Sequence, residues 1–102
     1  MGIFGIGDEK VNVIGEIRAK AGCEEAVRAM LTALVGKSLE AKGCKVYRLH
    51  EDKTRPGLFF TYEEWGSETA LKEHLIGVKQ TTEQAKPLLE GEIRLSVLKL
   101  LA

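Results

Sequence analysis

The sequence predicts an α+β protein of the ferredoxin-like class, with a four-stranded antiparallel sheet and helices on one face. Two observations carry this prediction. Apolar residues recur with a period of two in four segments, as strands require, and at helical spacing in the stretches between them. The segments follow one another in the order βαββαβ, which is the split βαβ arrangement of this class.

The first half of the chain supplies a strand, a long helix and a second strand. In the first strand, residues 11–19, Val13 and Ile17 share one face. A helix is expected over residues 23–42, with Gly43 ending it as its C′ residue. Residues 44–50 alternate as the second strand. The stripe that the helix should bury consists of Ala26, Val27, Met30, Leu31, Leu34, Val35, Ser38 and Leu39.

The second half starts after a polar turn that carries Pro56 and Gly57. Ser67 is a favourable N-cap for the second helix, which Gly77 interrupts. Pro87 should stop the helical course, because its ring disfavours helix for the preceding residue. The expected elements are a strand over residues 58–65, a helix from residue 67, a further helical piece over 78–86 and a last strand over 92–100.

Two of these strands are apolar on both faces, although helices can cover only one face of the sheet. Phe60 and Tyr62 alternate with Phe59 in the third strand, and Leu98 and Leu100 lie opposite other aliphatic residues in the last one. An exposed apolar sheet face usually marks a partner surface. A two-fold dimer that packs sheet against sheet would cover it. We therefore expect an obligate homodimer through the open sheet face.

Composition favours one ordinary globular domain. The 102 residues, 44% hydrophobic and 29% charged, suffice for a single core, which we place at residues 11–102 after a flexible leader at 1–10. Fifteen basic residues balance fifteen acidic ones, so nothing favours nucleic acid or an anionic membrane as a partner. No apolar run approaches the roughly 20 residues of a membrane span. Cys23 and Cys44 are too few for a disulfide framework or a metal site, which favours a reducing, cytoplasmic setting.

Three chemically informative side chains lie where the third strand passes into the second helix. The strand delivers Glu63 and Trp65 to a sharp turn, and the helix returns with His74 among its apolar positions. Imidazole titrates near neutrality, which suits a base, yet a histidine on an apolar helix face is more often a core residue. A buried carboxylate can act as a base or pair with a strand arginine such as Arg48 or Arg94.

Several short motifs make the sequence similar to the antibiotic biosynthesis monooxygenase family. The resemblance covers about residues 11–101 and implies a dimeric α+β barrel, the fold of quinol monooxygenases and anthrone oxygenases. The motifs are Ala21-Gly22 after the first strand, Gly43-Cys44-x-x-Tyr47 at the second, Glu63-x-Trp65-x-Ser67 at the third, and Ala70-Leu71-x-x-His74 in the helix.

The resemblance implies a monooxygenase that oxidises a small aromatic quinol, phenol or anthrone with dioxygen and uses no metal, flavin or haem. Such a substrate, once deprotonated, passes an electron to dioxygen itself, so the protein supplies an apolar pocket, a base and hydrogen-bond donors. His74 is the expected catalytic residue. Substrate contacts are expected from Trp65, Tyr47 and Glu63, and from Asn12 and Arg18 if their strand face lines the pocket.

One branch of the wider superfamily, the haem-degrading monooxygenases, fits less well. These use an Asn late in the first strand, a Trp on the second helix and a later His. Ile17 stands at the Asn position, His74 at the Trp position, and no histidine follows. The resemblance therefore disfavours haem.

Two other functions stay open on the sequence alone. A non-catalytic ligand-binding, stress-responsive or structural dimer of the same fold would be favoured by a pocket filled with Phe59, Phe60, Met30 and Leu71. An isomerase of the muconolactone type ranks lower, because it needs a small lactone and other polar groups.

Overall fold

A computed structural model describes residues 9–102 and confirms the βαββαβ order. Of the expected leader, residues 1–8 lie outside the described residues. The elements are β1 (Val11–Arg18), α2 (Glu24–Leu39), β2 (Cys44–Glu51), β3 (Leu58–Trp65), α3 (Glu68–Gly77), α4 (Lys79–Ala85), the 3₁₀ helix η1 (Lys86–Leu88) and β4 (Arg94–Leu98).

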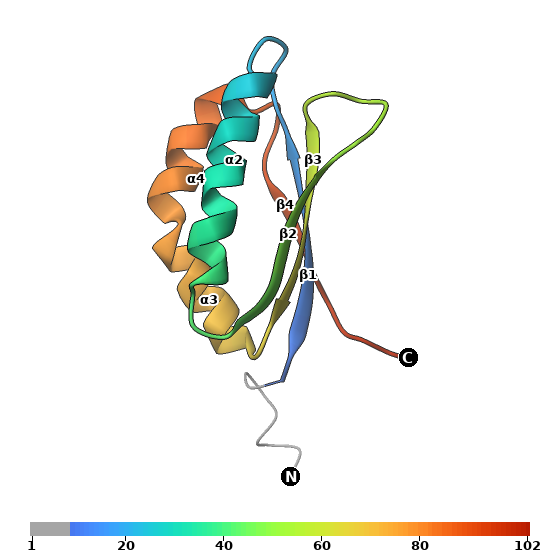
Figure 1. Cartoon of the computed structure of the whole chain (residues 1–102), viewed down its shortest axis with the longest axis vertical. Coiled ribbons are helices and arrows are strands. Elements are labelled where there is room, and N and C mark those ends of the chain that lie inside the picture. The colour runs from blue at the N-terminus through green and yellow to red at the C-terminus, as the bar shows by residue number, and fades with distance from the viewer. Residues whose placement is uncertain (1–8) are drawn as a thin grey trace.

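The strands form one antiparallel sheet in the order β2-β3-β1-β4, and the helices all lie on one of its faces (Figure 1). The register aligns Tyr47 of β2 and Val13 of β1 with Glu63 of β3. One row further along, Gly15 pairs with Thr61. Because side chains alternate across a strand, these residues all point toward the helices. The centre of the helix-facing surface is therefore polar.

The apolar core is divided into two clusters on this helix-facing side. One lies where α3 begins and contains Trp65, which is 1% exposed, together with Tyr47. The other contains Phe59, also 1% exposed, and reaches α4 and η1. Helix α2 packs along both, because Val27 and Leu34 are buried on its inner face. The buried members are Val11, Val13, Tyr47, Trp65, Ala70 and Leu71 in the first cluster, and Ile17, Ala19, Val27, Phe59, Ala85 and Leu89 in the second.

Two expected helix ends are wrong. Helix α2 ends at Leu39, with Glu40 as its C-cap, and not at residue 42. Gly43 lies beyond the helix with φ +84, and a Cβ on it would approach Ala70 Cβ to 2.6 Å, so glycine there lets α3 pack closely. The helical course also does not stop before Pro87, which fits into the first turn of η1 because that position needs no N–H.

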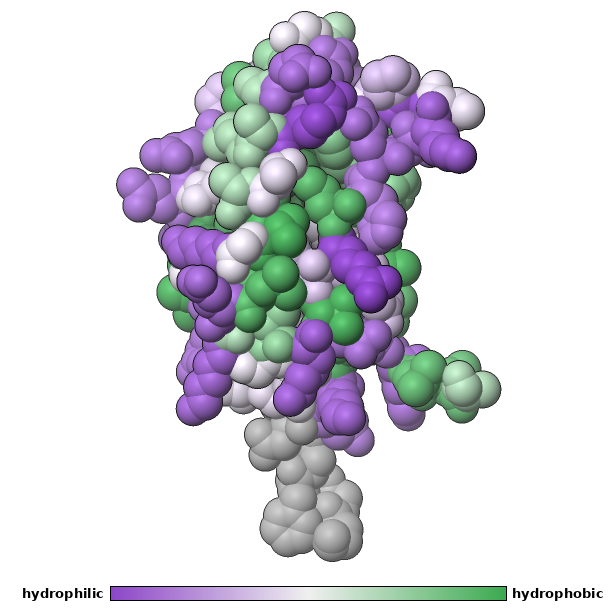
Figure 2. Space-filling view, viewed as in Figure 1, coloured by the Kyte–Doolittle hydropathy of each residue, from purple (hydrophilic) through white to green (hydrophobic). Residues whose placement is uncertain are grey.

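The last strand is shorter than expected, and its pairing explains why. Leu98 pairs with Asn12, one residue from the start of β1 at Val11. Only Val11 of β1 lies beyond this pair, so residues after Lys99 have no described strand residue opposite them in the same chain. Leu100 and Leu101 are 74% and 88% exposed, and Figure 2 shows the C-terminal end as an apolar projection that stands off from the body.

An ion-pair network fixes the start of α2 to the β2–β3 turn. Arg28 donates to both carboxylate oxygens of Glu51, at 2.9 and 2.7 Å, and Gly57 N–H donates to the same carboxylate at 2.9 Å. These hydrogen bonds, led by that from Arg28, lower the pKa of Glu51 to about 2. The network holds one end of the helix layer at a fixed distance from the sheet.

The face of the sheet without helices is partly apolar. Ile14 on β1 and Leu98 on β4, which lie diagonally across the two strands, are each 40% exposed, and Phe60 and Tyr62 on β3 are half-buried. Every residue of β4 is exposed. Within residues 9–102, no helix has the length and apolar character that crossing a membrane requires.

Candidate active site

A cavity of about 640 Å³ lies between the sheet and the helix layer. About half of its lining residues are aliphatic, among them Leu34 of α2, Leu75 of α3 and Leu95 of β4. Charged, exposed side chains border it at α4, η1 and the loop before β4, where Lys86 pairs with Glu83 at 3.1 Å. Four buried polar side chains also line it: Tyr47, Thr61, Glu63 and His74. An apolar cavity with a few convergent polar groups is typical of a small-molecule site.

Glu63 is 4% exposed and is held by hydrogen bonds to both of its carboxyl oxygens. Trp65 Nε1–H donates to Oε1 at 2.9 Å, and the Thr61 hydroxyl donates to Oε2 at 2.8 Å. Burial raises the pKa of Glu63, and these two hydrogen bonds oppose the rise without cancelling it. Glu63 is thus a carboxyl group in a fixed orientation with a raised proton affinity.

The hydrogen bonds to Glu63 continue into the neighbouring strand. Gly15 N–H donates to Thr61 Oγ1 at 3.1 Å, so one hydroxyl accepts from β1 and donates to Glu63. A Cβ at Gly15 would clash with the same Thr61 Oγ1. Glycine is therefore required here by close approach, because any side chain would displace the hydroxyl that orients the carboxyl.

His74 is carried into the site by α3, which Ser67 caps by accepting a hydrogen bond from Ala70 N–H at 3.0 Å. The imidazole is 7% exposed and packs against two aromatic rings. Its centroid lies 4.5 Å from that of Trp65, in a tilted arrangement, and 5.6 Å from that of Tyr47, edge to face. Burial, with the nearby cation of Lys37, lowers the pKa of His74. The ring is thus neutral at neutral pH and free to accept a proton.

Tyr47 faces the same cavity with its hydroxyl protonated. Burial, reinforced by the charge of Glu63, raises the pKa of Tyr47 well above the ordinary value. Ser38 of α2, which is fully buried, opposes this rise only in part. The Tyr47 hydroxyl is therefore a permanent donor over the whole physiological range.

The structure separates the residues that the sequence suggested. His74, Tyr47 and Glu63 line one cavity. Trp65 does not line it: the indole lies one layer deeper, bonded to Glu63 and packed against His74, so its part is to position them. Among the described residues, Glu63 is bonded by Trp65 and Thr61 and pairs with no arginine.

Asn12 and Arg18 lie on the other face of the sheet. They alternate with Val13 and Ile17, which face the helices, so neither reaches the cavity. Arg18 instead lies 4.0 Å from Glu16 on its own strand. Their expected substrate contacts required that their face of β1 line the pocket, and this cavity adjoins the other face.

Three further residues of the site were not found from the sequence. Thr61 is a single hydroxyl between Phe60 and Tyr62, and Gly15 is a glycine inside a strand, which itself signals a close approach. No local sequence pattern indicates a role for Lys37, because this residue comes close to His74 only when α2 packs beside α3. In residues 9–102, no three His, Cys, Asp or Glu side chains are grouped so that they could hold a metal ion.

Comparisons with known proteins identify the family of the chain. The family model of antibiotic biosynthesis monooxygenases matches residues 10–77, which include Tyr47, Thr61, Glu63 and His74 of the cavity. No curated protein matches the sequence. Among solved structures, PA3566 from Pseudomonas aeruginosa is 30% identical, with a TM-score of 0.85 over 96% of this chain and 100% of that one. Rv0793 from Mycobacterium tuberculosis is 27% identical, with a TM-score of 0.85 over 92% and 97%. The chain belongs to the antibiotic biosynthesis monooxygenase family.

Proposed function

We propose that this protein is a monooxygenase that oxidises a small aromatic quinol, phenol or anthrone with dioxygen, using no cofactor. One observation carries the proposal: a largely apolar cavity of about 640 Å³ with a neutral imidazole and a buried carboxyl group in its wall. Family membership supports the reaction type. The side chains that would have filled the pocket, Phe59, Phe60, Met30 and Leu71, do not line the cavity.

In the proposed reaction His74 removes a proton from the substrate hydroxyl or from the activated methylene of an anthrone. The resulting anion transfers an electron to dioxygen, and recombination forms a C–O bond. The O–O bond then breaks: one oxygen atom stays in the product as a carbonyl and the other leaves as water. For a methylene group the reaction balances, because the group and one molecule of dioxygen give a carbonyl group and one molecule of water. The substrate carbon is oxidised and dioxygen is reduced.

The other polar groups have separate parts in this proposal. The Tyr47 hydroxyl, which stays protonated, donates to the developing oxyanion. Glu63, whose raised pKa favours the protonated form near acidic pH, binds a substrate hydroxyl and supplies a proton to the departing oxygen. Trp65 holds both His74 and Glu63 in place. The aliphatic wall keeps water from the anion, which strengthens each of these interactions.

We further propose that the protein acts as a homodimer through the open sheet face. Exposed Ile14 and Leu98 on that face, and the projecting Leu100 and Leu101, support it, because a monomer rarely leaves such surface uncovered. A two-fold axis would pack the two sheets together and leave the helix layers outside. The unpaired Cys23 and Cys44 fit a reducing, cytoplasmic setting.

Dioxygen uptake by metal-stripped protein, measured with a panel of quinols and anthrones, tests the proposal. Uptake well above the rate of autoxidation without protein is the expected result. If no panel member raises uptake while thermal shift shows that some of them bind, the alternative takes its place: a non-catalytic small-ligand-binding protein built on the same cavity.

A further inference from the structure

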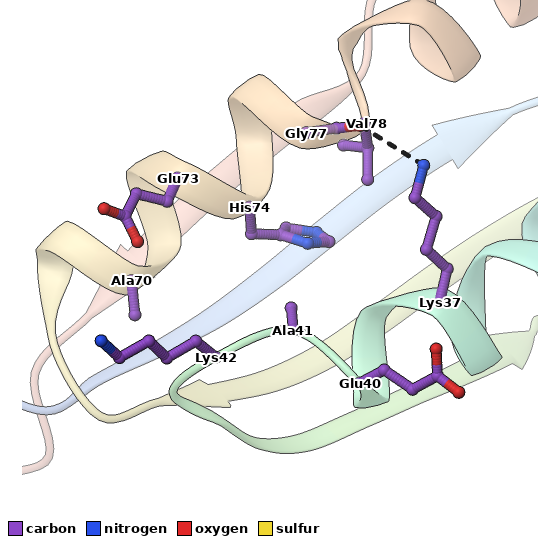
Figure 3. Close-up of a pocket in the computed structure, with 9 residues that line it drawn as sticks. All are labelled: Lys37, Glu40, Ala41, Lys42, Ala70, Glu73, His74, Gly77 and Val78. Atoms are coloured by element: carbon purple, nitrogen blue, oxygen red, sulfur yellow. Dashed lines mark hydrogen bonds between the residues drawn. The ribbon is translucent and has the colours of Figure 1, made fainter.

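A second hollow meets His74 from the outside of the helix layer. This groove, of about 270 Å³, runs between the C-terminal end of α2 and helix α3. Figure 3 shows its residues: Lys37 and Glu40 come from the end of α2, Ala41 and Lys42 follow, and α3 supplies the other wall. The groove lies on the side of the molecule away from the open sheet face, so a dimer of the proposed kind leaves it accessible.

His74 is one of two residues that border both this groove and the inner cavity among those described; the other is Val78. The imidazole is therefore the polar partition between the two spaces. The Ala41 methyl group points toward the ring from the opposite wall of the groove (Figure 3). A base in this position contacts the substrate space on one side and a space open to solvent on the other.

Lys37 spans the groove at one end. Its Nζ–H donates to the carbonyl oxygen of Gly77 at 3.5 Å, at the C-terminal end of α3, where a cation is favoured by the helix dipole. This contact places the ammonium group near His74. A cation there disfavours a proton that lingers on the imidazole, so the ring is driven back to its neutral form.

We propose that the groove is the route by which His74 exchanges protons with solvent, separate from the substrate cavity, and that Lys37 is a positioning residue on this route. This rests on the proposed function, which gives His74 a proton to lose. The ring accepts the substrate proton on one nitrogen and releases the proton on the other nitrogen to water in the groove. One N–H bond forms and one breaks, the ring returns to its neutral state, and one proton passes from substrate to solvent.

The route answers a problem that the cavity poses. When substrate fills the cavity, water is displaced from it, and a protonated base has no water on that side to take its proton. The charged and titratable groups around the imidazole fall into two sets, one at the inner cavity and one at the groove. Glu63 and Tyr47 face it from β3 and β2, Lys37 and Glu40 from α2, Lys42 from the following loop, and Glu73 from α3 itself. Carboxylates at the groove's rim are suitable acceptors for the departing proton.

Carbethoxylation by diethylpyrocarbonate, followed residue by residue with mass spectrometry, tests the route without any substrate. The chain has two histidines, and His50 is exposed and serves as the internal reference. At about pH 8 imidazole rings are neutral, so the rates report access and not charge. Ala41→Leu fills the groove, and Leu31→Phe fills the inner cavity as the matched control. Gly77→Leu is a second groove variant, because a Cβ there meets no heavy atom within 4 Å.

We expect Ala41→Leu and Gly77→Leu to slow the modification of His74 several-fold and Leu31→Phe to leave it unchanged, each relative to His50. Lys37→Met should open the groove, speed the modification and raise the pKa of His74 in an NMR titration, whereas Lys42→Met should not raise it. Slowing by Leu31→Phe alone would overturn the proposal, since His74 would then exchange through the substrate cavity. These rates are independent of whether any substrate is oxygenated.

Discussion

The indole of Trp65 packs against the imidazole of His74, with ring centroids 4.5 Å apart, and donates its Nε1–H to Glu63 at 2.9 Å. One buried ring thus positions both groups that can exchange protons in the cavity. Thr61 adds the second hydrogen bond to Glu63 and takes one from the Gly15 backbone. The site is therefore tied to β1 and β3, the two central strands of the sheet.

Removing the Thr61 hydroxyl should destabilise the protein. Thr61→Val keeps the shape but leaves the Gly15 N–H and one Glu63 oxygen without a partner, which costs about 1 to 3 kcal/mol of unfolding free energy. Thr82→Val removes an exposed hydroxyl that bonds the Lys79 carbonyl oxygen and should cost no more than about 0.5 kcal/mol. Urea unfolding of both variants provides the comparison. Equal costs would mean that the Thr61 contacts contribute nothing specific.

The lowered pKa of His74 makes stability depend on pH. The unfolded chain binds a proton near pKa 6.5 while the folded chain resists it, so stability is complete above about pH 6.5 and falls as the pH decreases toward the folded-state pKa. Glu63, with its raised pKa, acts in the opposite sense: its contribution is complete below about pH 4.5 and is lost as the pH rises through its folded-state pKa.

We therefore predict that His74→Gln loses less unfolding free energy than the wild type between about pH 7.5 and pH 5.5. His50→Gln, at an exposed position, should keep the wild-type loss. Chemical unfolding at the two pH values measures both. A His74→Gln variant with the full wild-type loss would show that this imidazole titrates alike in the folded and unfolded chains.

Two glycines should respond to alanine with opposite signs. Gly36 lies inside α2, where a Cβ meets nothing within 4 Å, so Gly36→Ala should stabilise the protein by about 0.5 to 1 kcal/mol. Gly43 has φ +84 and a Cβ on it would approach Ala70 Cβ to 2.6 Å, so Gly43→Ala should destabilise it by more than about 1 kcal/mol. Thermal unfolding of the two variants measures both changes in stability. A stabilised Gly43→Ala would contradict the packing of α3 described above.

A charged substitution tests whether the open sheet face is the dimer interface. Leu98→Asp places a carboxylate beside Ile14 in the proposed interface, so the variant should become monomeric or unfold. Ile76→Asp is the matched control, because Ile76 is 74% exposed but lies on α3, in the helix layer. Sedimentation of both variants gives the oligomeric state. A stable Leu98→Asp dimer would place the interface elsewhere.

Period-two and helical patterns were enough to predict the fold, because most elements here are covered on one side. The alternation of Val13 and Ile17 against Asn12 and Arg18 assigns the correct faces of β1. The end of α2 was missed, since the glycine that resembled its C′ residue, Gly43, serves a contact with Ala70 that only the tertiary fold creates.

The site was predictable where its residues are close in the sequence. Glu63 and His74 follow one another across a single turn, and the cavity brings them together with Tyr47. The sequence does not show which face of the sheet the cavity adjoins. It therefore suggests Asn12 and Arg18 as site residues, although both lie on the other face. The proximity of Lys37 to His74 depends on how α2 packs beside α3, and no local pattern encodes it.

The most direct test of the proposed function is the fate of the two atoms of ¹⁸O₂ during turnover of a substrate identified by oxygen uptake. The proposed reaction should place one labelled oxygen atom in the product and one in water, with His74→Ala still folded but slower by about 10² to 10⁴-fold. His50→Gln should label the product at the wild-type rate. Product without label, or a His74→Ala variant that labels it at the wild-type rate, would contradict the proposed reaction.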